Sequence, residues 1–116
     1  MSVAMDPAGV EYVRWVLDAY RTTLGTTGHV RPADRRLARD LFARGVALQT
    51  VLDALLLATA RRYGRALPGS LPPTARSLAY FAPLVDELLG APLDDGYRRY
   101  LLAKLERCLP ALGINR

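Results

Sequence analysis

Arginine is concentrated in two short segments, and its planar guanidinium is suited to holding phosphate oxygens through paired hydrogen bonds. The first segment holds Arg31, Arg35, Arg36, Arg39 and Arg44, and the second holds Arg61, Arg62 and Arg65. A surface that combined both groups would bind a nucleic-acid backbone, because phosphate contacts give affinity without reading sequence. The alternative is a solvated face in a chain that is rich in arginine throughout, since fifteen of its sixteen basic residues are arginine. The charges alone leave both interpretations open.

An aromatic pair and a leucine offer a second kind of surface. At helical spacing, Trp15 and Tyr12 project away from the main apolar stripe of their segment, and Leu57 does the same in a later segment. An exposed aromatic ring can stack on a nucleic-acid base or anchor a protein partner. Because a small helical protein has few helices with which to cover both sides, the pattern predicts a homodimer or an obligate partner that uses these residues. Burial of the same side chains within one chain is the competing expectation.

Residues that support catalysis or metal binding are few. His29, the only histidine, lies in a polar loop without a second ligand nearby, and Cys108, the only cysteine, falls on an apolar helix stripe. One histidine does not build a zinc site, and a cysteine on such a stripe is expected to be a buried, unreactive thiol. Neither the phosphate-binding pattern G-x-x-x-x-G-K-[ST] nor the metal-binding pattern H-E-x-x-H occurs. The sequence therefore predicts no catalytic site, no metal and no cofactor.

The composition predicts one small folded domain that covers residues 1–116. Of these residues 51% are hydrophobic and 23% are charged, which suffices for a buried core and excludes a disordered tail. The formal net charge is +5. Charged residues interrupt every apolar stretch before the roughly 18 to 20 residues that a membrane span requires, and the first residues show no signal-peptide pattern. We therefore expect a cytoplasmic protein that does not enter a membrane.

Apolar residues recur at helical spacing along the chain, and no alternating strand pattern occurs. The sequence therefore predicts an all-α fold, a compact bundle of five helices. Their expected ranges are 7–24, 32–44, 48–63, 73–89 and 95–109. Asp6 is the expected N-cap of the first helix, and Asp94 or Asp95 that of the fifth. Pro83 removes a backbone donor inside the fourth range, so we expect a kink or split near Phe81, which would give six helices.

The third predicted helix is apolar on nearly all sides, which is typical of a central or interface helix. Leu52 and Leu55 are expected to be fully buried there, and Val10 and Leu102 to face inward from the first and fifth helices. The second and third helices are joined only by a short turn at Gly45, which predicts a packed antiparallel hairpin. In a DNA-reading helix-turn-helix the second helix would carry polar residues, whereas this one is apolar.

The hairpin has a consequence for the arginines. If it is tight, Arg31 lies toward the far end of the third helix, and the two arginine groups join into one patch. Within the first group, Arg36 is spaced to form an ordinary surface ion pair with Asp40.

Six short motifs follow one another over about half of the chain: Asp34-Arg35-Arg36-Leu37-Ala38, Arg44-Gly45-Val46, Ala54-Leu55-Leu56-Leu57-Ala58, Ala60-Arg61-Arg62, Arg76-Ser77-Leu78-Ala79-Tyr80-Phe81 and Pro83-Leu84-Val85-Asp86-Glu87-Leu88. In these motifs the chain resembles a class of small helical proteins and C-terminal modules associated with bacterial mobile elements and with plasmid or phage replication. Replication initiators carry a winged-helix or other DNA-reading domain before such motifs, and this sequence shows none, so we do not expect an initiator role. The resemblance implies a cytoplasmic accessory protein near nucleic acid, without a catalytic residue to carry over.

Two functions follow as expectations. The first is a non-enzymatic, nucleic-acid-associated accessory protein whose arginines hold phosphates. The second is a helical protein-interaction adaptor or homodimerisation module. The placement of the arginines discriminates between them: one contiguous patch favours nucleic acid, whereas scattered arginines paired with Asp40, Asp53 and Asp86 favour the adaptor.

Overall fold

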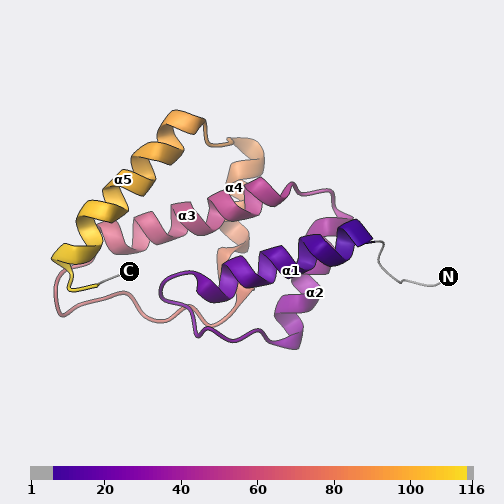
Figure 1. Ribbon diagram of the computed structural model, residues 1–116, viewed down its shortest axis with the longest axis horizontal. Helices are drawn as coiled ribbons and strands as arrows, with labels where there is room; N and C mark the ends of the chain where they lie inside the picture. Colours follow the sequence, from indigo (N-terminus) through magenta and orange to yellow (C-terminus); the bar gives the residue numbers. More distant parts are fainter. Residues whose placement is uncertain (1–6, 115–116) are drawn as a thin grey trace.

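The computed structural model describes residues 7–114 of the 116-residue chain (Figure 1). Five α-helices are present in this range, namely α1 (Pro7–Thr22), α2 (Pro32–Ala43), α3 (Leu48–Gly64), α4 (Ala82–Gly90) and α5 (Asp95–Ala111). A 3₁₀ turn, η1 (Leu78–Phe81), runs directly into α4. The predicted all-α bundle is confirmed, and the predicted interruption near Phe81 is the junction between η1 and α4.

Local chemistry accounts for several helix ends. Asp94 caps α5, because its carboxylate accepts a hydrogen bond from the Tyr97 backbone N–H at 2.7 Å. Pro32 occupies the first turn of α2, where no backbone donor is needed. Gly45 follows the end of α2 with a φ of 74°, a conformation that glycine adopts without steric cost. Asp6, the expected cap of α1, lies outside the described residues.

Helix α3 is the centre of the structure. It packs against α1, α4 and α5, and Figure 1 shows it between α1 and α5. Its buried side chains lie on nearly all sides, as the apolar pattern predicts. The prediction that Leu57 faces outward is wrong: its side chain is only 2% exposed, since α4 and α5 cover the sides of α3 that the main apolar stripe leaves open.

The predicted antiparallel hairpin of α2 and α3 is wrong. Helix α2 packs against α1 and η1 rather than along α3. Two long-range contacts hold it there. The Phe42 ring lies 5.3 Å from the ring of Tyr12 on α1, and the buried carboxylate of Asp34 accepts a hydrogen bond from the Leu78 backbone N–H at 2.8 Å. These contacts turn α2 away from α3, so the two arginine groups are not merged by a hairpin.

The connector before η1 is extended, so the fourth helix starts later than predicted. The Ala75 backbone N–H donates to the Gly25 carbonyl at 2.7 Å, which ties this connector to the loop after α1. Gly25 has a φ of 81°, and a Cβ atom there would collide with the Tyr63 hydroxyl. A glycine is therefore required at this crossing of three segments.

Three other expectations need correction. Val10 and Leu102 are exposed rather than inward-facing, and Leu52 is only partly buried. Helix α5 ends at Ala111 rather than at Leu109, so Pro110 lies within its last turn. The principal dimensions are 52 × 29 × 21 Å, so the smallest is about two helix diameters, and helices in such a flat arrangement keep open faces.

Candidate nucleic-acid interface

The outer side of α2 carries an unpaired row of arginines. Arg31, Arg35 and Arg39 follow one another at four-residue intervals, which places them on one side of the helix about 6 Å apart along its axis. Arg36 lies beside them, and all four side chains are exposed. None of the four forms an ion pair with a carboxylate of residues 7–114, and the expected pair between Arg36 and Asp40 is not formed there. We call Arg31, Arg35, Arg36 and Arg39 the α2 basic face.

Helix α1 extends this surface across a shallow groove. The groove has a volume of about 410 Å³, and four arginines line it, namely Arg14, Arg21, Arg35 and Arg39. The two from α1 are partly neutralised within their own helix, because Arg14 pairs with Glu11 at 3.5 Å and Arg21 pairs with Asp18 at 3.1 Å. The uncompensated charge therefore comes from the α2 side of the groove.

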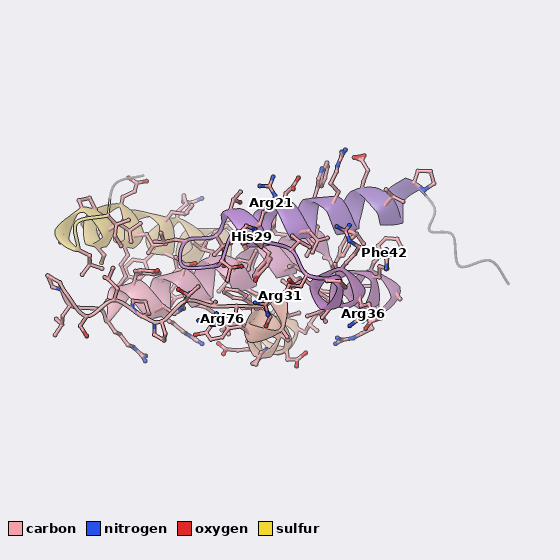
Figure 2. All side chains as sticks on the ribbon, turned by 90° about the horizontal axis from the view of Figure 1, so that it is seen from below. Arg21, His29, Arg31, Arg36, Phe42 and Arg76 are labelled. Atoms are coloured by element: carbon pink, nitrogen blue, oxygen red, sulfur yellow. The ribbon has the colours of Figure 1, made fainter. Side chains whose placement is uncertain are left out.

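Arg76 adds a cation that the sequence analysis did not assign to the interface. It is exposed, has no ion pair among the described residues, and precedes the 3₁₀ turn that Asp34 holds against α2. In the view of Figure 2, Arg31, Arg36 and Arg76 all appear on the face that is seen from below. Local sequence spacing does not predict that Arg76 lies near the α2 basic face, because a contact between residues 44 positions apart places it there.

The second arginine group makes contacts within the chain instead. Arg61 forms a two-pronged ion pair with Glu87 of α4, with N–O distances of 2.7 and 3.0 Å. The carboxylate raises the pKa of Arg61, and the guanidinium lowers the pKa of Glu87. Arg62 donates to the Pro73 carbonyl and lies over the Tyr80 ring at 5.1 Å. Arg65 is exposed, but it follows the far end of α3, a helix about 25 Å long.

Arg44, at the end of α2, is also partnered. Its guanidinium lies 3.7 Å from the carboxylate of Asp86 on α4, and both side chains are largely exposed. Of the eight arginines predicted to bind phosphate, the four of the α2 basic face therefore form one unpaired group, while Arg44 and Arg61 are paired with carboxylates.

The predicted aromatic surface is divided. Trp15 is 51% exposed, whereas Tyr12 is buried against Phe42. Burial raises the pKa of Tyr12, and its hydroxyl has no hydrogen-bond partner within residues 7–114. Tyr12 and Leu57 are therefore core residues, and the prediction that they form a surface with Trp15 is wrong.

The remaining candidate groups are the single histidine, the single cysteine and a buried aspartate. His29 is exposed as predicted, and Cys108 is partly buried. Asp53 is buried, but Arg98 donates two hydrogen bonds of 2.8 Å to it, and Gln49 donates a third of 2.9 Å. These donors lower the pKa of Asp53, so the group is a structural ion pair. Within the described range, no three histidine, cysteine, aspartate or glutamate residues cluster in a way that could hold a metal ion.

Comparison with known proteins places no further constraint on the site. No protein family, curated protein or solved structure matches the chain. None of the helices between residues 7 and 114 combines the length and the apolar character that crossing a membrane requires.

Proposed function

We propose that the protein is a non-enzymatic, cytoplasmic accessory protein that binds nucleic acid through its phosphate backbone. The α2 basic face is the binding surface, extended by Arg76 and by the groove between α1 and α2. The observation that carries the proposal is the absence of any carboxylate partner, within residues 7–114, for the four exposed arginines of that face. An accessory role near nucleic acid is also what the resemblance to mobile-element and replication modules implies.

The charge distribution supports this assignment. The chain carries a net charge of +5, and the α2 basic face groups four exposed arginines without a carboxylate partner among the described residues, whereas Arg44 and Arg61 are paired with Asp86 and Glu87. Guanidinium groups hold phosphates through paired hydrogen bonds, and their binding releases the counterions that surround a nucleic acid. The face consists of arginines without an aromatic side chain, and we propose that they contact phosphates, so that binding is independent of sequence.

The test is fluorescence anisotropy with labelled single- and double-stranded DNA and RNA over a salt series. Replacing Arg35, Arg36 and Arg39 together with alanine should weaken binding to all sequences alike. For duplex DNA, the slope of log affinity against log salt should become shallower by about 0.9 for each phosphate that the variant no longer neutralises.

A matched control variant loses the same number of positive charges from a different part of the surface. Arg65, Arg99 and Arg107 are exposed and have no ion pair among the described residues, so their triple alanine variant also removes three positive charges. This control should bind nearly as well as the parent. Equal weakening by both triple variants would show that net charge rather than the α2 basic face is responsible. No binding by the parent at low salt would refute the proposal.

A protein-interaction adaptor is the second candidate. The ion pairs of Arg44 with Asp86 and of Arg61 with Glu87 favour it, because they use arginine to join helices rather than to hold a ligand. The same salt series separates the two candidates, since an adaptor of this kind would show no salt-dependent affinity for nucleic acid.

A further inference from the structure

Helix α3 lies between α1 and α5 (Figure 1), and side chains of these three helices line an open apolar groove. Its volume is about 710 Å³. Leu52, Leu55 and Leu56 of α3 form its floor. Ala19 of α1 and Leu102 of α5 stand on its two walls. Below, this is called the α1–α5 groove.

The lining of the groove offers almost no polar group to a ligand. Three threonine hydroxyls reach it, but each already donates to a carbonyl of its own helix: Thr22 to Asp18 at 2.7 Å, Thr23 to Ala19 at 2.6 Å and Thr59 to Leu55 at 2.7 Å. Among the described residues, Glu106 is the one charged residue of the lining. An occupant must therefore be held by apolar contact.

Two large apolar side chains project beside this hollow. Leu102, on its wall, is 47% exposed. Trp15 lies one turn before Ala19 on the same side of α1, and it is 51% exposed. An exposed apolar patch of this kind usually marks a contact surface. A projecting side chain next to a groove also suits a two-fold symmetric dimer. The symmetry axis then places the projecting side chain of each copy over the groove of the other copy.

The distribution of charge on the molecule indicates which kind of molecule the groove can bind. The molecule carries +5, and its unpaired α2 basic face repels a second copy. Among residues 7–114, no basic residue lines the groove, and the cations on the outer side of α1 are paired, Arg14 with Glu11 and Arg21 with Asp18. On α5, Arg99 is exposed and has no ion pair within the described range; it lies one turn before Leu102, on the same side of the helix as the lining residue Glu106, which carries the opposite charge. A polyanion finds no counter-charge in such a lining, whereas two like-charged copies meet there with little cost.

We propose that the α1–α5 groove is a self-association surface. Two copies meet about a two-fold axis, so that Trp15 of each copy covers the groove of the other and both Leu102 side chains become buried. This inference does not depend on nucleic-acid binding.

The single tryptophan makes the test direct. Sedimentation velocity over a concentration series should show a mass that doubles, and the Trp15 emission should shift to shorter wavelength over the same concentrations because its ring leaves water. Leu102→Glu places a charge in the interface, and it should keep the protein monomeric with an unshifted emission. Leu89→Glu is the matched control, since Leu89 is 48% exposed on α4 and does not line the groove.

The outcomes separate cleanly when circular dichroism verifies that each variant is folded. A dimeric parent with a dimeric Leu89→Glu variant and a monomeric Leu102→Glu variant supports the proposal. A parent that stays monomeric throughout the concentration series, or a dimer that Leu102→Glu leaves intact, overturns it. If Leu102→Glu is unfolded, the concentration dependence of the parent's Trp15 emission decides, because an unchanged spectrum alone refutes burial of that ring.

Discussion

At the scale of residues, two buried carboxylates fix the arrangement of helices. Asp34 accepts hydrogen bonds from the Arg31 backbone N–H at 2.9 Å and from the Leu78 backbone N–H at 2.8 Å, so one side chain caps α2 and holds η1 against it. Asp53 joins α3 to Arg98 of α5. Asp34 accepts two hydrogen bonds and Asp53 accepts three, as buried polar side chains require.

The ion pair of Asp53 and Arg98 gives a prediction for acid stability. Because Arg98 lowers the pKa of Asp53, the unfolded chain takes up a proton before the folded chain does. The contribution of this carboxylate to the free energy of unfolding is therefore complete above the unfolded pKa of about 3.9 and is lost as pH falls below it. Asp53→Asn should lower stability at neutral pH by about 1–3 kcal/mol, and it should flatten the acid dependence measured by urea unfolding at several pH values.

Asp95→Asn is the control for this prediction. Asp95 also pairs with Arg98, but its side chain is largely exposed, and an exposed ion pair adds little to stability. The Asp95→Asn variant should unfold at nearly the same urea concentration as the parent. Equal losses in the two variants would contradict the assignment of the stabilising contact to the buried carboxylate.

At the scale of elements, α3 has one side filled by other helices and one side open to the α1–α5 groove. Leu52 and Leu55 both line the groove floor, but the side chain of Leu55 is buried, whereas that of Leu52 is only partly buried. Leu55→Ala should therefore cost about 2–5 kcal/mol, the range for a cavity in a packed core. Leu52→Ala should cost less in the monomer, because water already reaches its side chain. Thermal or urea unfolding at low protein concentration measures both changes, and equal losses of stability would show that Leu52 is as enclosed as Leu55.

The same elements show what a sequence can predict. The spacing of apolar residues was enough to find the helices and the central position of α3, since both depend on local periodicity and on how many sides of a helix are apolar. The direction of α2 was not predictable, because it depends on Asp34 reaching Leu78, 44 residues away. The α2 basic face was found from local spacing, whereas the placement of Arg76 and the burial of Leu57 depend on that tertiary arrangement.

At the scale of the whole molecule, the two proposed surfaces occupy different places. The α2 basic face lies on the outer side of α2, and the α1–α5 groove opens over α3 between α1 and α5. A dimer formed through the groove would therefore leave both α2 basic faces free. The two proposals are compatible, and together they describe a particle with two separate phosphate-binding surfaces.

This combination predicts a dependence on nucleic-acid length. When one face of a dimer holds a nucleic acid, the second face binds intramolecularly if the strand reaches it, which raises the apparent affinity by a factor of about 100. A short oligonucleotide contacts one face and gains nothing. Anisotropy at fixed low salt should therefore show tighter binding of long than of short duplexes by the parent and by Leu89→Glu. Leu102→Glu should lose the advantage of length while its affinity for short duplexes stays unchanged, because the α2 basic face is intact.

Two outcomes would contradict this prediction. If Leu102→Glu weakened the binding of short and long duplexes equally, Leu102 would act on the nucleic-acid surface itself. If the parent bound short and long duplexes equally well, the two faces would not act together.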